Sequence, residues 1–397
     1  MVVNGWLCIL RSLYRRVSRT TRSEKPELGQ NKSIDSSATQ YHQLYRISSH
    51  IYLISSHIYF KMDTLPHPPT PLTAPYKQIN SSTITADIYL PPPQPPQSDN
   101  EPTHYPVLIN IHGGAFMLGH SRMVSLPQIS DCLARGWIVA VPNHRLCPGV
   151  DVLSGPMADI RDFLAWIYAG QDQDGLDSFL QGQEKEYRVD RERVMAFGTS
   201  SGGFLALSLG YDVPRRPKAI LDFYGAVHFT HPSWTQPLPH VKSMLPSFEP
   251  EFLAKVYTEF PIPTSSGISL EGPSGARNKP DFSRPRDAFA LTQIANGNVL
   301  RAIFPPECGD IRTIDPVVRV ETEEAFPPTF IVHGDRDRMV SVEVSRELYR
   351  VLRERGVECG IVEVEGEDHT FAMGMEVGSR TWIRQREGFE WLEKVIR

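Results

Sequence analysis

The stretch Phe197-Gly198-Thr199-Ser200-Ser201-Gly202-Gly203 decides the fold of this chain. The largely apolar run Arg193-Val194-Met195-Ala196 before it predicts a buried strand, and residues 204–207 after it predict a helix. Its flanking glycines permit a sharp turn, because side chains at those positions would collide across it. A G-x-S-x-G pattern between strand and helix is typical of a nucleophile elbow. We therefore interpret Ser200 as the candidate nucleophile, the alternative being an ordinary glycine-rich turn.

The composition indicates a globular protein with an acidic body. The 397 residues are 40% hydrophobic, enough for one large α/β domain or two smaller ones. Residues 1–61 hold nine Lys or Arg against three Asp or Glu, which leaves 32 against 43 in residues 62–397, a net charge of −11. This balance argues against nucleic acid as a partner. Because no apolar run approaches the ~20 residues that a transmembrane helix needs, we expect no membrane span.

The number and spacing of the cysteines indicate the cellular compartment of the protein. None of them forms a C-x-x-C pair, so the common zinc and redox motifs are missing. Free thiols are typical of a reducing compartment, and we expect a cytoplasmic protein. The five scattered positions are Cys8, Cys132, Cys147, Cys308 and Cys359.

Residues 1–61 differ from the rest of the chain. Residues 6–22 are apolar and arginine-rich with no acidic residue, as mitochondrial presequences often are. A pentapeptide at residues 48–52 recurs at 55–59, and Met62 opens a stretch like an ordinary protein start. We favour the hypothesis that residues 1–61 are a disordered or wrongly assigned upstream extension of a domain at 62–397. The alternative is a genuine presequence and a mitochondrial location.

Strand and helix patterns alternate from Tyr76 onward. This alternation predicts a mainly parallel sheet with helices on both faces. It breaks down between His228 and about Val320, a stretch too long for a plain connection, which we interpret as a cap over the ligand-binding edge of the sheet. The predicted strands are residues 83–90, 106–111, 137–141, 219–223, 329–332 and 360–364, and the predicted helices are 128–135, 159–167, 343–355 and one ending near Val395.

A second glycine-rich loop, His112-Gly113-Gly114-Ala115-Phe116, follows the predicted strand at 106–111. Backbone N–H groups of a glycine pair can approach a reacting carbonyl without obstruction from side chains. With the N–H of Ser201, those of Gly113 and Gly114 are predicted to form an oxyanion hole. We interpret His112 as a structural residue of this loop, and a tight turn without function is the alternative.

The loops after the last two predicted strands supply an acid and a base. We choose Asp337 as the acid, because Ser341 is the better N-cap for the following helix. Asp335 is the alternative. His369 is the candidate base, so the chain order becomes serine, acid, histidine, as a nucleophile elbow leads one to expect.

From Tyr76 onward the chain resembles α/β-hydrolases of the esterase and lipase type. The resemblance rests on H-G-G at 112–114, N-H-R-L-C-P at 143–148 and G-x-S-x-G around Ser200. Hormone-sensitive-lipase-like esterases usually have a third glycine where this chain has Ala115. The H-G-D-x-D segment at 333–337 is more similar to dienelactone hydrolases, prolyl-peptidase-like proteins and kynurenine formamidases. The resemblance implies an α/β-hydrolase fold with a central parallel sheet and an inserted cap.

The residues predict acyl transfer without a metal or organic cofactor. His369, oriented by Asp337, deprotonates Ser200, which attacks a carbonyl, and water releases the acyl group. The leading hypothesis is hydrolysis of a carboxylic ester of a small to medium hydrophobic molecule, with the oligomeric state left open. It draws on aromatic residues of the insertion, which can equally form the cap's own core: Phe229, Trp234, Phe248, Phe252, Tyr257 and Phe260.

Three alternatives accompany this hypothesis. Amide or formamide hydrolysis requires the same triad. From the resemblance alone, similar hydrolases act in fungal pathways to polyketide or polyketide-peptide metabolites, where they process or release an intermediate. Non-catalytic receptors with this fold typically lack the triad histidine, so His369 argues against a receptor.

Overall fold

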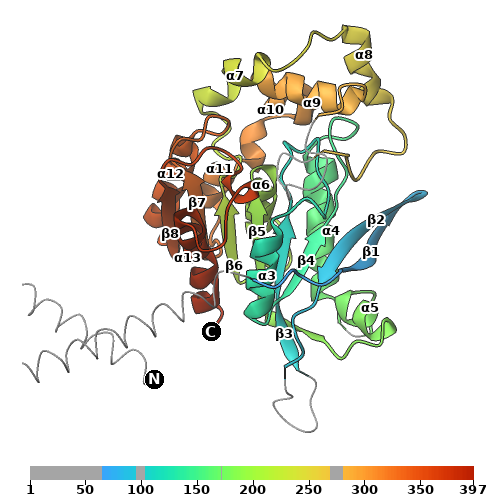
Figure 1. The fold of residues 1–397 in the computed structure, drawn as a ribbon, viewed down its shortest axis with the longest axis vertical. Helices are drawn as coiled ribbons and strands as arrows, with labels where there is room; N and C mark the ends of the chain where they lie inside the picture. The colour runs from blue at the N-terminus through green and yellow to red at the C-terminus, as the bar shows by residue number, and fades with distance from the viewer. Residues whose placement is uncertain (1–64, 95–102, 171, 269–279) are drawn as a thin grey trace, which may run out of the picture. The chain divides into compact units, whose positions relative to one another are not determined.

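The computed structural model describes residues 65–94, 103–170, 172–268 and 280–397, so the hypotheses about residues 1–61 lie outside the described residues. An eight-stranded sheet in the order β1-β2-β4-β3-β5-β6-β7-β8 forms the centre (Figure 1). The antiparallel strands β1 and β2 occupy one edge, and the other six strands are mutually parallel. The bounds are Leu72–Ile79, Ser82–Tyr89, His104–Ile111, Ile138–Pro142, Arg188–Thr199, Ala219–Phe223, Thr329–Gly334 and Cys359–Val364 for β1 to β8.

The parallel register brings the predicted loops to one edge of the sheet. Ile111 at the end of β3 pairs with Gly198 near the end of β5, so the H-G-G loop begins beside the elbow. On the other side of β5, Thr199 pairs with Phe223 of β6. Strands β4 and β6 are buried throughout, as expected of apolar parallel strands that are covered on both faces.

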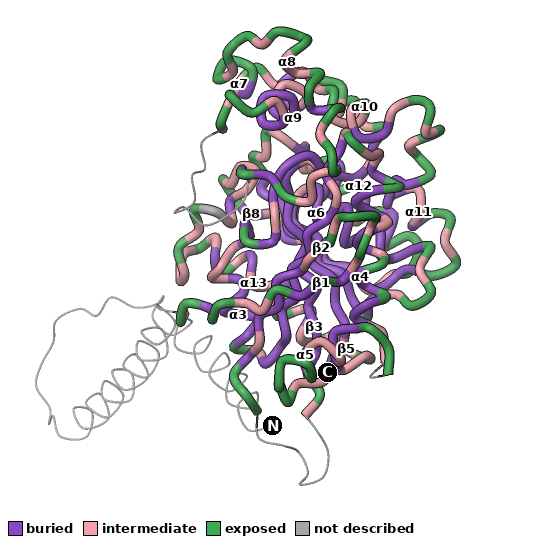
Figure 2. Tube along the Cα trace, turned by 90° about the vertical axis from the view of Figure 1, so that its right-hand side faces the viewer, coloured by how far each residue is buried: buried purple, intermediate pink, exposed green. Residues whose placement is uncertain are grey.

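Helices cover both faces of the sheet. Helices α3 (Leu126–Ala134) and α13 (Arg380–Val395) cover one face, through buried side chains such as Ile129 and Phe389. Helices α4 (Ala158–Tyr168), α6 (Ser201–Leu207) and α12 (Val342–Glu354) contribute to the core on the other face. Figure 2 shows the buried residues concentrated along the sheet between these layers. This arrangement is the α/β-hydrolase fold, and the predicted fold class is confirmed.

Outside the connection between β6 and β7, two elements were not predicted from the sequence. Strand β1 contains Pro75, which lacks an N–H donor and argues against an interior strand. The strand lies at the sheet edge, and its pairing with β2 shifts register between Pro75 and Lys77, so the missing donor is tolerated there. Helix α5 (Leu176–Gly182) has seven residues, too few to show a clear helical period.

In its described residues, the long connection between β6 and β7 contains five short or medium α-helices. Figure 1 places α7 to α10 together on one side of the sheet, at the top of the view. The last of the five, α11, instead packs against α12 of the sheet layer. The bounds are Pro239–Lys242, Pro250–Ala254, Pro285–Ala295, Val299–Ile303 and Pro316–Thr322 for α7 to α11.

Candidate active site

The turn between β5 and α6 holds Ser200 in a strained backbone conformation, with φ 53° and ψ −120°. Its N–H donates to the carbonyl oxygen of Phe223 at 2.9 Å. A Cβ atom on Gly198 would lie 2.0 Å from the carbonyl oxygen of Gly202, and one on Gly202 would lie 2.1 Å from that of Ile111. Both glycines are therefore sterically required, as the sequence predicts.

The structure brings Ser200, His369 and Asp337 together. The Nε2 atom of His369 lies 3.0 Å from Oγ of Ser200, and Nδ1 lies 2.6 Å from Oδ2 of Asp337. Each residue comes from the loop that follows a parallel strand, β5, β7 or β8. The arrangement can pass a proton from the serine hydroxyl to an imidazole that a carboxylate orients.

The alternative acid, Asp335, has another position. It is exposed, and its Oδ1 accepts a hydrogen bond from the N–H of Gly366 at 2.6 Å, which links the loops after β7 and β8. Ser341 caps α12 as predicted, with its side chain accepting from the N–H of Glu343.

The surroundings of Asp337 keep its carboxylate ionised. Its side chain is fully buried, and Oδ1 accepts from the N–H groups of Met339 and Val340 at 2.8 and 2.9 Å. Burial alone raises the pKa of Asp337, but contacts with His369 and His333 outweigh burial and hold the pKa well below its usual range. A carboxylate in this state stabilises the imidazolium that forms on His369.

His333 is a site residue that sequence reasoning missed. Its Nε2 lies 3.1 Å from Oδ2 of Asp337 and 3.0 Å from the carbonyl oxygen of Val340. Its Nδ1 lies 2.8 Å from Oγ of Ser345 in α12. The sequence signal was a histidine four residues before the acid, at the end of a buried strand.

The loop after β3 has an unusual backbone. Gly114 has φ +126°, and its carbonyl oxygen accepts from the N–H groups of Met117 and Leu118. The next residues, Ala115 and Phe116, have φ values of 52° and 63°, in the region that favours glycine. Ala115 thus adopts a left-handed conformation at the position where the resembling esterases have their third glycine.

The predicted oxyanion donors belong to the loop after β3 and to the residue that follows Ser200. In the described ranges, no protein atom accepts a hydrogen bond from the N–H of Gly114 or Ser201. Ser201 lines the pocket beside Ser200, whereas on the other loop Ala115, and not Gly113 or Gly114, lines it. The Gly113 carbonyl accepts from Nδ1 of His112 at 2.8 Å, which fits the structural role predicted for that histidine.

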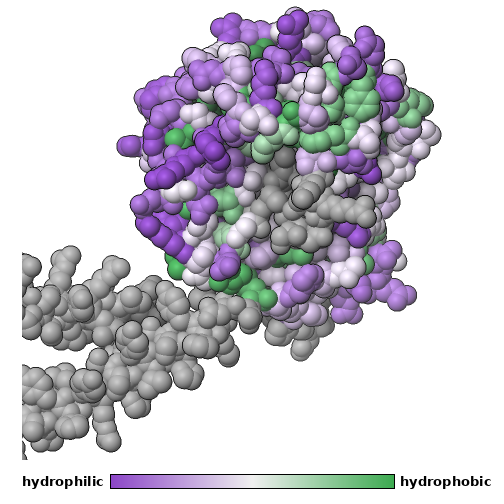
Figure 3. Space-filling model, turned by 45° about the horizontal axis from the view of Figure 1, so that its top comes forward, coloured by the Kyte–Doolittle hydropathy of each residue, from purple (hydrophilic) through white to green (hydrophobic). Residues whose placement is uncertain are grey.

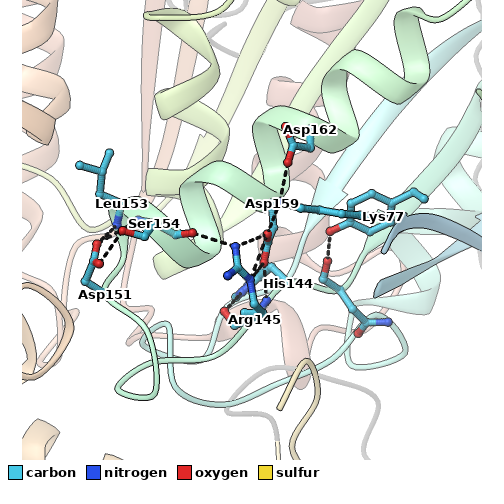
Figure 4. Close-up of polar contacts among 10 residues, drawn as sticks. Lys77, His144, Arg145, Asp151, Leu153, Ser154, Asp159 and Asp162 are labelled. Carbon is cyan, nitrogen blue, oxygen red and sulfur yellow. Dashed lines mark hydrogen bonds and ion pairs between the residues drawn. The ribbon is translucent and has the colours of Figure 1, made fainter. Parts of the chain in front are cut away.

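A cluster of ion pairs around one buried carboxylate holds the N-H-R-L-C-P run in place (Figure 4). The carboxylate of Asp159 is fully buried and contacts Arg145 at 2.7 Å and Lys77 at 2.6 Å. At the other end of the run, the N–H of Cys147 donates to the carbonyl oxygen of Phe116 at 3.0 Å. The salt-bridge cluster therefore supports the loop that carries the candidate oxyanion donors.

A largely apolar pocket of about 600 Å³, including the space at its mouth, opens onto Ser200 and His369. Its walls come from the strand ends and loops of the body and from the connection between β6 and β7. The apolar wall residues are Ala115, Phe116, Ala226, Trp234, Leu238, Ile294, Val299, Met339 and Val340, and Ser233 and Gln236 add polar groups.

The aromatic residues of the insertion were predicted either to contact substrate or to form the cap's own core, and the structure has them in different positions. Trp234 lines the pocket, with its Nε1–H donating to the carbonyl oxygen of Val227 at 3.0 Å. Phe229 packs behind Trp234, and Phe248 stacks on Phe252. Phe260 is 84% exposed. Figure 3 shows apolar residues gathered among polar ones on this side of the molecule.

Two further observations concern metals and membranes. Among the described residues, no cluster of three or more His, Cys, Asp or Glu is arranged to hold a metal ion. In the same residues, no helix is long and apolar enough to cross a membrane. The four described cysteines are free thiols.

Comparison with known sequences finds an α/β-hydrolase-like family, BD-FAE, whose model matches residues 86–248. The non-reducing polyketide synthase ausA of Penicillium brasilianum is 30% identical over 327 residues, which are 76% of this chain and 13% of the synthase. The non-reducing polyketide synthase atr1 of Stereocaulon alpinum is 26% identical over 344 residues, 82% of this chain and 13% of the synthase. The chain therefore spans a small part of these relatives.

Two solved structures that align with this chain are described here, and the first of them supports the fold. A Staphylococcus aureus protein of unknown function aligns with a TM-score of 0.57 and 19% identity, covering 83% of this chain and 100% of that protein. A Thermogutta terrifontis esterase, Est2, aligns with a TM-score of 0.47 and 18% identity, over 84% and 95% of the two chains. The strand order and the elbow are those of the α/β-hydrolase fold, and residues 86–248 of this chain resemble the BD-FAE family.

Proposed function

We propose that the protein is a serine hydrolase that cleaves a carboxylic ester of a small to medium hydrophobic molecule. The observation that carries this proposal is the hydrogen-bonded path from Ser200 through His369 to Asp337, which opens into a largely apolar pocket. Such a path supplies nucleophile, base and orienting acid in one geometry.

In the proposed reaction, Nε2 of His369 takes the proton of Ser200 as the serine oxygen attacks the ester carbonyl. The oxyanion of the tetrahedral intermediate lies near the N–H groups of Gly114 and Ser201, which have no other acceptor among the described residues. The imidazolium then gives its proton to the leaving alcohol. Water, deprotonated by the same imidazole, releases the acid from the acyl-enzyme.

A second candidate function narrows the acyl group to a polyketide. The observation that favours it is that the relatives described above are non-reducing polyketide synthases, matched over three quarters or more of this chain. An oxygen ester and a thioester pass through the same tetrahedral intermediate, so the triad serves either bond. On this proposal the enzyme processes or releases a polyketide acyl intermediate.

A fluorophosphonate probe tests the common core of both candidates. It should label the full-length protein at Ser200 and fail to label the correctly folded Ser200→Ala variant. The absence of labelling in folded wild-type protein would refute the hydrolase.

Matched substrates then separate the bond types. One aromatic acyl group is offered as oxygen ester, thioester and amide, and an N-formyl arylamine serves as the formamide. We expect the highest kcat/KM for the ester or thioester. Faster turnover of the amide or formamide would replace the proposal with the amidase alternative.

A further inference from the structure

The carboxylate of Asp337 has all four of its lone-pair positions occupied. Oδ1 accepts from two backbone N–H groups, of Met339 and Val340. Oδ2 is shared by two imidazoles, His369 at 2.6 Å and His333 at 3.1 Å. An ionised carboxylate accepts about four hydrogen bonds, so this one has no freedom to rotate without losing a partner.

The hydrogen bonds of His333 assign its tautomer. The carbonyl oxygen of Val340, 3.0 Å from Nε2, can only accept, so Nε2 carries the proton and is shared between Val340 and Asp337. Its Nδ1 then accepts from the hydroxyl of Ser345 at 2.8 Å. His333 and Ser345 are fully buried, which protects these bonds from competition with water.

The Tyr224 ring lies edge-on to both imidazoles, at 4.8 Å from His369 and 6.2 Å from His333. His333 is fully buried, and it does not line the pocket, whereas His369 does. The contact of His333 with the site is therefore made through Asp337.

We propose that His333 is a positioning residue, whose Nε2–H holds Oδ2 of Asp337 in line with Nδ1 of His369 while Ser345 fixes the His333 ring. The inference rests on the proposed function, since it assigns a task within the same triad. Without the His333 donor, Oδ2 is free to turn away from His369, and the imidazolium formed during acylation loses its partner. Substrate binding is not affected, because His333 does not line the pocket.

The test compares His333→Phe, which keeps a ring of similar shape, with His333→Gln, whose amide can donate from the position of Nε2. In His333→Phe we expect kcat to fall about ten- to a hundred-fold, the effect of one lost hydrogen bond to a charged group. KM should stay within about twofold, and the rate of fluorophosphonate labelling should fall in parallel with kcat. His333→Gln should recover most of the rate.

Two serine variants cover the case in which His333→Phe does not fold. Ser345→Ala removes only the hydrogen bond to Nδ1 and should lower kcat several-fold. Ser130→Ala, which removes another largely buried serine that bonds to Pro66 far from the site, should leave kcat unchanged.

The outcomes are distinct. If the probe labels the wild type but folded His333→Phe keeps the wild-type kcat, the positioning role is overturned. The hydrolase proposal is then unaffected. Equal losses in His333→Phe and His333→Gln, in proportion to a fall in Tm, would make His333 merely structural. Failure of the wild-type protein to react with the probe would refute the hydrolase itself.

Discussion

The guanidinium of Arg286, on cap helix α9, donates from Nη1 to the carbonyl oxygen of Met117 at 3.0 Å, which ties the cap to the loop after β3. The same nitrogen donates to the carbonyl oxygen of Cys147 at 2.5 Å, and Nη2 pairs with Glu259 at 2.6 Å. One buried side chain thus joins the insertion, the candidate oxyanion loop and the N-H-R-L-C-P run.

Replacement of Arg286 by Met should therefore weaken both stability and catalysis. The variant leaves two carbonyl oxygens and the partly exposed Glu259 without their donor, which we expect to cost about 2–3 kcal/mol of unfolding free energy. Urea denaturation and kcat are the measurements. Arg284→Met is the matched control at the start of the same helix, because its pair with Asp281 is exposed and screened by solvent. Equal effects of both variants would contradict the proposed link.

The two aspartates after β7 should differ sharply in their effect on activity. Asp337→Asn cannot hold His369 in the required tautomer, and we expect kcat to fall about 10⁴-fold. Asp335→Asn weakens one exposed contact with Gly366 and should stay within about threefold of wild type. Ester hydrolysis kinetics decide the matter, and the opposite ranking would exchange the roles of the two acids.

A buried acid beneath the elbow predicts a pH dependence of stability. Asp222 of β6 is fully buried and packs so closely on Gly203 and Gly225 that a Cβ atom on either would lie 2.2 Å from its Oδ1. Burial raises the pKa of Asp222 to about 7, although the contact with the backbone N–H of Gly225 works in the opposite direction.

The raised pKa fixes the sign of this effect. In the folded protein the carboxyl stays protonated up to about pH 7, whereas the unfolded chain ionises it above 3.8. The contribution of Asp222 to the free energy of unfolding is complete below pH 4 and declines toward pH 7. The total decline is about 1.4 kcal/mol for each unit by which the folded pKa exceeds the unfolded pKa. Urea unfolding of wild type and Asp222→Asn at pH 5 and 7.5 measures this decline. Identical pH slopes for the two proteins would show that Asp222 does not titrate in this range.

Trp234 should determine which acyl groups bind. Trp234→Ala removes an indole wall of the pocket, and we expect kcat/KM for bulky aromatic esters to fall about tenfold while acetate esters change little. The control is Phe260→Ala, since that ring is 84% exposed and does not line the pocket. A parallel loss for aromatic and acetate esters would instead indicate damage to the triad.

Local sequence was sufficient to place the triad residues side by side. Ser200, Asp337 and His369 each follow an apolar run that reads as a parallel strand, and such strands end at one edge of a sheet. The glycines beside Ser200 indicate a sharp turn. The order serine, acid, histidine along the chain then identified Asp337 and His369 as its partners.

The features that sequence reasoning missed depend on packing between distant segments. The contact between Arg286 and Met117 joins residues 169 apart in the chain, and neither belongs to a recognisable motif. Pro75 of β1 lacks an N–H donor, and only the place of β1 at the sheet edge makes the strand possible. In the sequence, His333 was noted only as part of the H-G-D-x-D segment. Its role depends on its contacts with Asp337 and Ser345, which form only in the folded chain.

The origin of the pocket walls has a consequence for how this protein diversifies. The wall residues that the insertion supplies, from Ser233 to Val299, belong to one uninterrupted stretch between β6 and β7, and no triad residue lies within it. A single recombination event that exchanges this gene segment between relatives would transfer substrate preference while the bond-breaking groups are inherited unchanged. Substrate range and chemistry can therefore evolve at independent rates in this chain.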